Sequence, residues 1–431
     1  MRASNMEKQD TLWRRTARGS FNTTAPLPDA VDVAVIGAGF TGLTTALCLA
    51  RAGRKVAVLE RSFLGEGASG QNAGFVVPNF ALADPQVVHR KLGEEKGNAL
   101  LDLVSQGADA VFETIRDHGI ACDALQSGWL NPAVTDDAAD MLKGRAEFWQ
   151  SRNRPVRYLS QPEILQQTGM TLYKGALLDE SGGTIHPLDY LFGLAHAVEA
   201  QGGTVHEAAC VKQARKENGN WHLTLEDGRA LMARQIVYCT NAFTKGVSRR
   251  LGLSTVPLRV YQVATRPIAQ EVVDRIAPDH RSVGDTRKNL FTYRLDRENR
   301  LISGGMSAIP IGAKKRLGEA IVNRLAHELS LPTVPEIEVV WTGVAAMTPD
   351  FLPRIHCMGD NAFAGIGCNG RGIAMTTQLG RVLADALMGA HVDKLPIPLR
   401  KVQRLPFHSL MPLATSASLI MARIEDSLAH R

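Results

Sequence analysis

The pattern of hydrophobic and polar positions predicts a strand, a helix and a second strand at the front of the folded chain. Residues 31–36 are rich in β-branched side chains, as is typical of a strand buried on both faces. Residues 41–52 are predicted to form a helix that ends at Gly53, and residues 55–59 a second buried strand. A polar arm, residues 1–29, precedes this βαβ unit.

The middle of the chain combines helices with β segments. Apolar residues recur every three or four positions over 98–118, which predicts one long amphipathic helix. A second helix is expected over 188–200 and a strand over 204–211. An Asp-Gly turn flanked by alternating residues then predicts a β-hairpin, followed by a strand that returns to the first sheet. These last segments are residues 221–225, 229–232 and 235–239.

Between about residues 255 and 345, alternation of apolar and polar residues favours an antiparallel sheet. Segments 291–295 and 300–303 are predicted strands, and 314–329 is a predicted helix. The last strong helix is expected over 373–388, directly after a glycine-rich loop.

Length and composition indicate a globular protein with a substantial core. The chain has 431 residues, of which 45% are hydrophobic and 21% charged, so two or three structural units are expected. The net charge of +6 comes from scattered Lys and Arg residues. The sequence therefore predicts no nucleic-acid partner and favours acidic small molecules.

Cysteine spacing and the N-terminus bear on metal sites and location. No pair of the six cysteines has the two-residue spacing of a zinc site, so no metal and no disulfide framework is expected. The polar N-terminus lacks the apolar core of a secretory signal, so the expected location is cytoplasmic. The uncharged run 33–50 has the length of a membrane span, but its glycines and threonines indicate a strand, a turn and a helix, so no transmembrane segment is expected.

The first candidate cofactor motif is a GxGxxG pattern that follows the first strand and opens the first helix. It consists of Gly37, Ala38, Gly39, Phe40, Thr41 and Gly42. Such glycines permit a tight turn, a close backbone approach to a pyrophosphate and close packing of helix on strand, while the helix N-terminus offers free N–H groups. Glu60, 18 residues after Gly42, is the expected acceptor for the ribose hydroxyls, and Arg61 beside it is a further candidate.

A second cluster of small residues occupies positions 65–74, five residues after Glu60. Small residues with Ser and Asn side chains suit a backbone that wraps closely round a planar or phosphorylated ligand. The candidate cofactor residues here are Ala68, Ser69, Gly70, Gln71, Asn72 and Ala73.

A third glycine-rich cluster begins at residue 365 and leads into the last strong helix. A helix N-terminus aimed at a ring carbonyl stabilises negative charge, which reduced flavin carries near N1 and the C2 carbonyl. Three separate glycine-rich turns imply a long cofactor, which favours FAD over NAD. The candidates in this cluster are Gly367, Asn369, Gly370, Arg371, Gly372 and Ile373.

Together these segments resemble the D-amino-acid-oxidase-like FAD-dependent oxidoreductases, and within them the γ-glutamylputrescine oxidase group, with sarcosine and glycine oxidases as cousins. The matching segments occur in family order and cover most of the chain. They are Thr11-Leu-Trp13, DVAVIGAGFTGLTTALCLARAG, VAVLE, GASGQNAG, residues 184–187, 238–242, 341–343 and 348–350, and GIGCNGRGIAMTTQLGRVLADAL.

The resemblance implies an α/β fold in which a Rossmann-like FAD-binding domain is joined to an antiparallel-sheet α+β substrate domain that roofs the flavin. The expected division is an arm over 1–29, a discontinuous FAD-binding domain over 30–90, 180–250 and 341–400, a substrate domain over 91–179 and 251–340, and a C-terminal helical tail over 401–431. The tail fits a partly amphipathic helix that packs on the body or on a partner.

The resemblance also implies residues beyond the glycine-rich turns. Val211 is expected near the adenine through its backbone, and Thr240 and Asn241 are expected to close the nucleotide site. Gly343 aligns where some relatives attach flavin to a cysteine, so noncovalent FAD is expected. Cys368 lies in a different motif and is expected to be a buried structural thiol.

The reaction implied is oxidation of the C–N bond of an amine or amino acid, with hydride transfer to flavin N5 and hydrolysis of the imine. A secondary amine or an N-substituted amino acid is the expected substrate. Arg294, on a predicted strand of the roof, is expected to bind its carboxylate bidentately. Tyr261 is expected to line the same pocket and Asn369 to lie at the flavin edge, while His186 is interpreted as structural rather than as a base.

The electron acceptor stays open at this point. Sarcosine-oxidase relatives carry a lysine over the flavin that promotes reaction with oxygen, and the aligned residue here is Ile302. An oxidase that forms peroxide is therefore weighed against a dehydrogenase that reduces a quinone or a protein. A flavin-holding subunit of a larger complex is a third alternative, and a homo-oligomer is compatible with all three.

Overall fold

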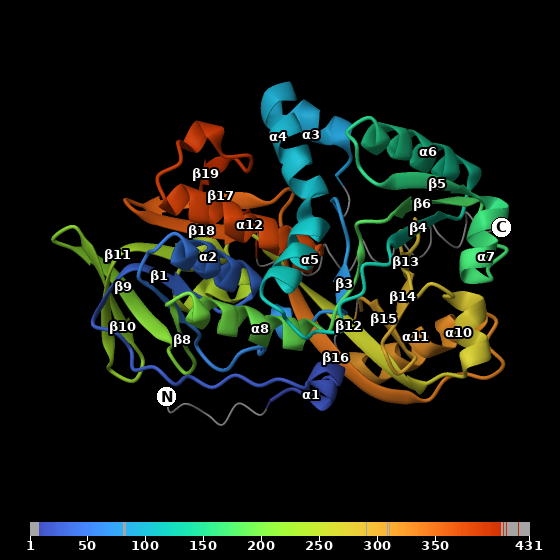
Figure 1. Ribbon diagram of the computed structural model, residues 1–431, viewed down its shortest axis with the longest axis horizontal. Helices are drawn as coiled ribbons and strands as arrows, with labels where there is room; N and C mark the ends of the chain where they lie inside the picture. The colour runs from blue at the N-terminus through green and yellow to red at the C-terminus, as the bar shows by residue number, and fades with distance from the viewer. Residues whose placement is uncertain are drawn as a thin grey trace.

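The computed structural model describes residues 8–406 except 81, 82, 290, 308 and 310, and beyond them only 408, 411 and 421. The helix predicted in the C-terminal tail lies outside the described residues. Two β-sheets lie on opposite sides of the molecule and are joined by helices near its middle (Figure 1). One sheet is mostly parallel and the other largely antiparallel, which is the α/β class that the resemblance implied.

The first sheet contains the βαβ unit and runs in the order β19-β17-β18-β11-β1-β2-β8, with β10 and β9 attached beside β11. Strand β1 pairs in parallel with both β2 and β11, and β10 forms a hairpin with β11. These pairings confirm the predicted βαβ unit and hairpin. The segments predicted separately over 229–232 and 235–239 form one continuous strand, β11, which both closes the hairpin and returns to the first sheet. The strands are β1 (Ala30–Ile36), β2 (Val56–Leu59), β8 (Thr204–His206), β9 (Val211–Glu217), β10 (Asn220–Leu225), β11 (Ala230–Tyr238), β17 (Arg354–Gly359), β18 (Ala362–Ile366) and β19 (Leu399–Lys401).

Helices α2 (Phe40–Arg51), α8 (Pro187–Ala200) and α12 (Gly372–Leu387) pack beside this sheet. Helices α2 and α12 approach closely because Gly380 has no side chain: a Cβ there would lie 2.7 Å from the carbonyl oxygen of Thr41. The Thr45 hydroxyl donates to the Gly380 carbonyl across the same contact, at 3.1 Å. Close packing thus holds together two helices that both begin at glycine-rich turns.

The second sheet runs in the order β16-β12-β15-β14-β13-β4-β6-β5. It has its own hydrophobic core, to which helices α10 and α11 contribute. Its strands are β4 (Trp129–Ala133), β5 (Val156–Ser160), β6 (Gly175–Asp179), β12 (Val256–Pro267), β13 (Ser282–Gly284), β14 (Thr292–Leu295), β15 (Arg300–Gly305) and β16 (Ile337–Met347). The helices of this half are α6 (Asp136–Gln150), α7 (Gln161–Thr168), α10 (Gln270–Ile276) and α11 (Ala313–Glu328).

Smaller elements connect the two halves. A two-stranded sheet joins β3 (Phe75–Val76) to β7 (Gly183–Thr184). The remaining helices and helical turns are α1 (Leu12–Thr16), η1 (Ala68–Gly70), α3 (Pro85–Leu92), α4 (Glu94–Ser105), α5 (Gly107–Asp117), η2 (Asn241–Gly246), α9 (Arg249–Gly252) and η3 (Val392–Lys394).

The prediction of one long helix over 98–118 is wrong in one respect: the segment is broken at Gln106 into the two helices α4 and α5. The Ser105 hydroxyl donates to the Asp102 carbonyl, and Gly107, a poor helix former, follows directly. Gly107 also packs against α12, where a Cβ would lie 3.3 Å from Ala374. The apolar period predicted the buried face correctly but could not show this break.

Two other expectations differ from the structure at their boundaries. The strand predicted over 204–211 ends at His206, and Ala208 has a left-handed φ of 50° before β9 begins. The expected boundary at residue 341 falls inside β16, which pairs with β12 of the second sheet along its length. Helices α4 and α5, in a segment assigned to the substrate domain, share the hydrophobic core of α12.

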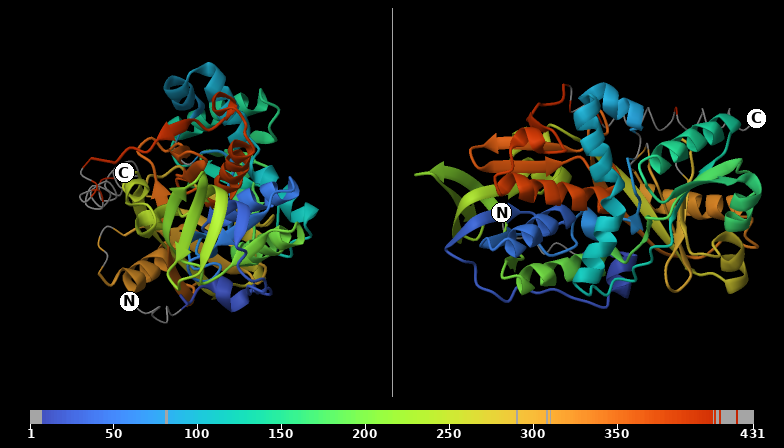
Figure 2. Two further views of the ribbon diagram at one scale, coloured as in Figure 1. Left: turned by 90° about the vertical axis from the view of Figure 1, so that its left-hand side faces the viewer. Right: turned by 45° about the horizontal axis from the view of Figure 1, so that its top comes forward.

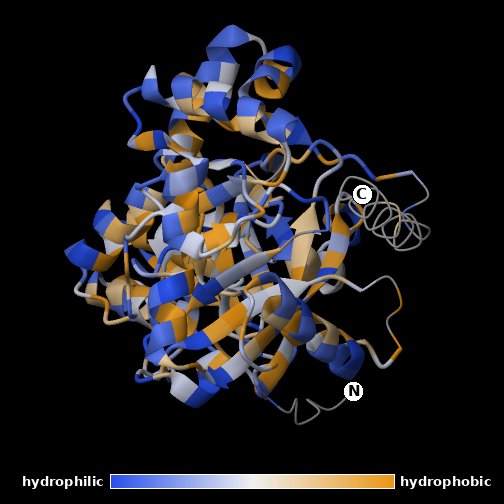
Figure 3. Ribbon diagram, turned by 90° about the vertical axis from the view of Figure 1, so that its right-hand side faces the viewer, coloured by the Kyte–Doolittle hydropathy of each residue, from blue (hydrophilic) through white to orange (hydrophobic). Residues whose placement is uncertain are grey.

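Figure 2 repeats the arrangement from two further sides, with α4 and α5 standing between the two sheets. The helices carry both hydrophobic and hydrophilic turns, as expected of amphipathic helices at a protein surface (Figure 3). Within the described ranges, every helix is too short or too polar to cross a membrane.

Candidate cofactor and substrate site

A cavity of about 1100 Å³ runs from the first sheet to the second. All three glycine-rich turns contribute to its wall, although they are far apart in the sequence. The predicted cofactor residues that line it are Gly37, Ala38, Gly39, Phe40, Thr41, Glu60, Arg61, Ala68, Ser69, Gln71, Asn72, Ala73, Val211, Thr240, Asn241, Gly343, Gly367, Asn369, Gly370, Arg371, Gly372 and Ile373.

Two predicted cofactor residues, Gly42 and Gly70, do not line the cavity. A Cβ on Gly42 would collide with the Gly37 carbonyl, and one on Gly70 would collide with the Gly65 carbonyl. Both glycines therefore serve backbone packing, which for Gly42 is the role that the motif predicted. We correct the expectation for Gly70, which supports the loop without facing the cavity.

The first turn leaves room for a ligand at its centre. Gly37 has a φ of 103°, and a Cβ there would lie 2.7 Å from the Cys239 carbonyl, so only glycine fits. A Cβ on Gly39 would instead meet only the Ser69 hydroxyl, at 3.1 Å. That hydroxyl accepts from the Phe40 N–H at the start of α2, at 3.0 Å. The helix start, Gly39 and Ser69 thus meet at one place on the cavity wall.

Glu60 follows β2 and faces the same cavity. Its carboxylate accepts from the Ala38 N–H at 3.0 Å and from the Ser62 N–H at 3.3 Å. Burial raises the pKa of Glu60, and these two hydrogen bonds oppose that rise. A buried carboxylate held by backbone N–H groups retains lone pairs for further donors, as an acceptor of ribose hydroxyls requires.

The second cluster forms a loop that is fixed from outside. The Trp13 indole N–H, from the N-terminal arm, donates to the Asn72 carbonyl at 2.6 Å, and the Trp341 indole N–H donates to the Gln71 carbonyl at 2.9 Å. The Asn72 side chain donates to the carbonyls of Ala68 and Ser69. Because these groups satisfy one another, the loop backbone faces the cavity in one defined conformation.

The third cluster reaches the cavity through an unusual backbone. Gly367, Asn369 and Gly370 all have left-handed φ values, of 88°, 53° and 84°. Helix α12 then begins at Gly372 without a side-chain cap. Its first N–H groups therefore lack intrahelical partners and lie at the cavity wall, where they favour a carbonyl or an anion.

The cavity continues to what we call its roof end, which is lined by Trp129, Arg145, Gln262, Thr292 and Arg371. Trp129, Arg145 and Gln262 belong to no sequence motif, so nothing in the sequence indicated them as site residues. The buried Oε1 atom of Gln262 has no hydrogen-bond partner among the described residues. A buried amide oxygen without a donor marks a place where a ligand N–H group fits.

Arg294, the residue predicted to bind substrate carboxylate, lies elsewhere. It does not line the large cavity, and only 3% of it is exposed. Its guanidinium donates to the carbonyls of Gly74 at 2.7 Å and Ile185 at 2.8 Å. We therefore correct its expected role, because it ties backbone segments together beside a smaller, separate pocket.

Tyr261 also fails to reach the cavity. Successive strand residues point to opposite faces, so Val260 and Gln262 of β12 line the cavity while Tyr261 packs into the core of the second sheet. Asn369 does line the cavity, but its side-chain oxygen accepts from the Thr348 N–H at 2.7 Å and its amide donates to the Gly367 carbonyl at 2.8 Å. Its side chain thus positions the loop at the cavity wall, and its polar atoms are already engaged by the protein.

Two further residues singled out from the sequence are buried away from the cavity. Ile302 packs in the core and is absent from the cavity wall, so the structure does not place it over the cofactor site. His186 accepts from the Asp189 N–H at 3.1 Å and lies 3.0 Å from the Thr16 hydroxyl. Burial lowers the pKa of His186, so it is neutral at pH 7, which fits the structural role predicted for it.

The residues present fit FAD on three observations. The cavity spans both sheets, and Cβ atoms added at Gly370 and Gly372 would meet no protein atom within 4 Å, which leaves an open cradle at the start of α12. That helix start is uncapped, and the Glu60 carboxylate is available at the other turn.

Within the described part of the chain, no group of three or more His, Cys, Asp or Glu residues could hold a metal ion.

Known proteins share both the sequence and the fold. Residues 32–386 match the family described as FAD dependent oxidoreductase. γ-Glutamylputrescine oxidoreductase of Escherichia coli (strain K12) is 30% identical over 394 residues, which cover 88% of this chain and 90% of that protein. Glycine oxidase of Geobacillus kaustophilus is 27% identical over 372 residues, 82% of this chain and 92% of that protein.

The crystal structure of glycine oxidase from Geobacillus kaustophilus has the same fold, with a TM-score of 0.71 at 22% identity over 88% of this chain and 100% of that one. The L-proline dehydrogenase from P. horikoshii gives a TM-score of 0.70 at 19% identity, over 86% and 96% of the two chains. Sequence match, fold and cofactor-shaped cavity agree, so the chain belongs to the D-amino-acid-oxidase-like family of FAD-dependent oxidoreductases and is an amine or amino-acid oxidoreductase.

Proposed function

We propose that this protein oxidises the C–N bond of a secondary amine or an N-substituted amino acid, using noncovalent FAD and passing the electrons to oxygen. The observation that carries the proposal is the continuous cavity, which joins the three glycine-rich turns to a roof end with unpaired polar side chains. Relatives named as γ-glutamylputrescine oxidoreductase and glycine oxidase act on nitrogen compounds, which supports this substrate class.

When bound, FAD supplies the acceptor for the hydride that leaves the carbon beside the amine nitrogen. The protein's own contribution is to bind and orient. Glu60 would accept the ribose hydroxyls, and the first N–H groups of α12 would favour negative charge on the ring system. At the roof end, Gln262 Oε1 would accept an N–H of the substrate amine and so fix the nitrogen.

Noncovalent binding rests on the side chains near the cavity. Gly343, at the position where some relatives carry an attachment cysteine, lines the wall. Cys368 also lines it, and burial raises the pKa of that thiol, which disfavours the reactive thiolate. Acid precipitation should therefore release all of the flavin into the supernatant, whereas flavin that stays with the protein pellet would contradict noncovalent binding.

The activity is tested with the purified protein and a panel of amines and amino acids. We expect a yellow protein whose visible flavin absorbance bleaches when a suitable secondary amine is added without oxygen. Readmitting oxygen should restore the colour and produce one peroxide for each flavin that is reoxidised. A colourless protein, or a yellow one that no member of the panel bleaches, would overturn the proposal.

A dehydrogenase that uses a quinone or a protein acceptor is the second candidate, and one observation favours it. The residue aligned with the oxygen-activating lysine of sarcosine oxidases is Ile302, which is apolar, packs in the core and does not line the cavity, so it supplies no positive charge at the flavin site. Turnover with oxygen and with an artificial dye separates the two candidates. Fast reduction of the dye without peroxide would assign the dehydrogenase. Cytoplasmic location remains a prediction, and cell fractionation tests it.

A further inference from the structure

Two arginines at the roof end of the cavity have no acidic partner. Arg145 projects from α6 and Arg371 immediately precedes α12, and both line the cavity wall. Among the described residues, no carboxylate lies within 4.0 Å of either guanidinium. The Arg145 guanidinium donates to the Met141 sulfur at 3.9 Å, and the Arg371 guanidinium lies 5.5 Å from the centre of the Trp129 ring.

The Nε atom of Arg371 is buried and has no hydrogen-bond partner within the described chain. An unpaired donor on a cation is costly to bury, so proteins normally pair such groups or aim them at a ligand. Burial, together with the positive charge of Arg145, lowers the pKa of Arg371 to about 10. The fold thus places two like charges on the wall of one cavity.

Nearby carboxylates form no ion pair with either arginine within the described residues, although Asp84 acts on Arg145 at longer range. Asp285, which also lines the cavity, is bound by Arg287 at 2.6 Å. Asp84, the acidic group that acts on Arg145, uses its Oδ1 atom to accept from the Val87 N–H at 2.7 Å and so caps α3. The positive charge at the roof end therefore remains available to a ligand.

We propose that Arg145 and Arg371 together bind a carboxylate of the substrate, so that the preferred substrate is an acidic amine such as an amino acid. This inference rests on the proposed function and narrows its substrate class. The fork of a guanidinium matches the two oxygens of a carboxylate, and charge-assisted pairs of this kind give both affinity and orientation. The two arginines that bind the carboxylate thus come from α6 and from the turn before α12. Arg294, on a strand of the second sheet, does not contact the substrate.

The position of the pair excludes the cofactor phosphates as its main ligand. The glycine turn at Gly39 and the start of α2 lie against the first sheet, whereas Arg145 belongs to a helix of the second sheet. Trp129 beside Arg371 is likewise a residue of β4. An anion held between these elements lies on the second-sheet side of the cavity, away from the glycine turn at Gly39.

The proposal is tested first by binding, which needs no turnover. The probes are acetate, succinate and glutarate, with the neutral glutaramide as their counterpart, titrated into the FAD-loaded protein and followed by the flavin difference spectrum. We expect at least one carboxylate to bind saturably and glutaramide to bind at least about 10-fold more weakly. Arg145→Met and Arg371→Met should each weaken carboxylate binding by about 10- to 100-fold.

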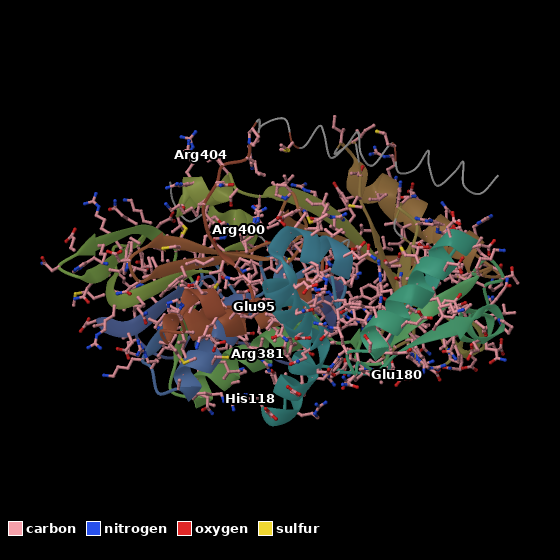
Figure 4. The ribbon with its side chains drawn as sticks, turned by 90° about the horizontal axis from the view of Figure 1, so that it is seen from above. Glu95, His118, Glu180, Arg381, Arg400 and Arg404 are labelled. Atoms are coloured by element: carbon pink, nitrogen blue, oxygen red, sulfur yellow. The ribbon has the colours of Figure 1, made fainter. Side chains whose placement is uncertain are left out.

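The matched control is Arg381→Met, which removes the same charge from the surface of α12. Arg381 is labelled in Figure 4, lies outside the cavity wall and is 3.9 Å from Glu113. This variant should bind carboxylates with wild-type affinity. Arg145→Lys should bind them with an affinity between those of the wild type and Arg145→Met. Failure of all three carboxylates to bind, equal binding of glutaramide, or unchanged binding in both methionine variants would each overturn the proposal.

A second measurement separates this inference from the proposed function. Each amine that bleaches the flavin is compared with its carboxamide, for example N-methylglycine with N-methylglycinamide. We expect Arg145→Met to raise the KM for the acid and to leave that for the amide unchanged. If no amine bleaches the flavin while carboxylates still bind through the two arginines, the proposed reaction is wrong and the anion site stands.

Discussion

Replacing Arg294 by methionine is expected to destabilise the fold and to leave substrate recognition intact. The variant loses a guanidinium that donates to the carbonyls of Gly74 and Ile185, at 2.7 and 2.8 Å, and from Nε to the Leu295 carbonyl at 3.2 Å. Gly74 precedes β3 and Ile185 follows β7, so one side chain of the second sheet fastens the small sheet that leads out of the second glycine-rich cluster.

The size of the effect follows from opposing contributions. A hydrogen bond from a charged donor contributes about 1.5–3 kcal/mol, so three lost bonds cost about 4–9 kcal/mol. Methionine also removes the cost of holding a buried cation. Burial lowers the pKa of Arg294 to about 10 from 12.5, which corresponds to about 3 kcal/mol. The free energy of unfolding should therefore fall by about 1–6 kcal/mol.

Urea unfolding of the FAD-loaded protein measures this loss, and the KM for a carboxylated substrate is determined on the same preparation. Arg381→Met again serves as the control for removing one surface charge. We expect lower stability, earlier loss of flavin on heating and a KM within about threefold of the wild type. Unchanged stability together with a KM raised tenfold or more would refute this reasoning and return Arg294 to the substrate site.

Three further substitutions test other parts of the structure. Gly372→Ala should weaken FAD binding by about 10-fold or more without lowering the stability of the apoprotein, because the added Cβ lies at the cavity wall and meets no protein atom within 4 Å. The control is Gly144→Ala on α6, where an added Cβ also meets no protein atom but lies outside the cavity. This control should raise the free energy of unfolding by about 0.5–1 kcal/mol and leave the FAD content unchanged. Fluorescence titration with FAD measures the first effect, and equal affinity in both variants would contradict the cradle. Trp13→Phe removes the 2.6 Å bond to the Asn72 carbonyl, so FAD should dissociate faster, and an unchanged release rate in stopped-flow fluorescence would show that the arm does not hold the loop. Burial raises the pKa of Asp179 from 3.8 to about 6, so between these pH values the folded protein keeps a proton that the unfolded chain releases. The free energy of unfolding should therefore fall by at most about 3 kcal/mol as the pH rises from about 4 to 6. Asp179→Asn should remove this loss in urea titrations at pH 4, 5, 6 and 7, and parallel curves for the two proteins would contradict the shifted pKa.

The first sheet was predictable from the sequence because its signals are local. The β-branched run before Gly37, the helix after it and the Asp-Gly hairpin each depend on neighbouring residues, and the observed pairings of β1, β2, β10 and β11 follow them. The break at Gln106 was not predictable, since it depends on Gly107 lying against Ala374 of α12, far along the chain. Tertiary packing decides such a break, and periodicity alone does not report it.

The roof end was predicted less well for a related physical reason. Both faces of β12 are buried from Tyr261 onward, so Tyr261 and Gln262 have similarly low exposure and alternation does not tell which of them faces the cavity. The structural role of Arg294 could not be predicted, because its partners are the backbone carbonyls of Gly74 and Ile185 and no sequence motif indicates them. Unpaired charges become visible only once the distances to every carboxylate are known, as for Arg145.

The two ends of the cavity therefore carry different kinds of specificity. A cofactor common to a whole family is held by backbone, and backbone contacts require glycines at fixed spacing, which is why Gly37, Gly39 and the turn before α12 could be found in the sequence. For a substrate particular to one protein we propose side-chain ligands such as Arg145 and Gln262, which line the cavity and belong to no sequence motif. The cofactor follows from the family, while the substrate must be decided by experiments on the roof end.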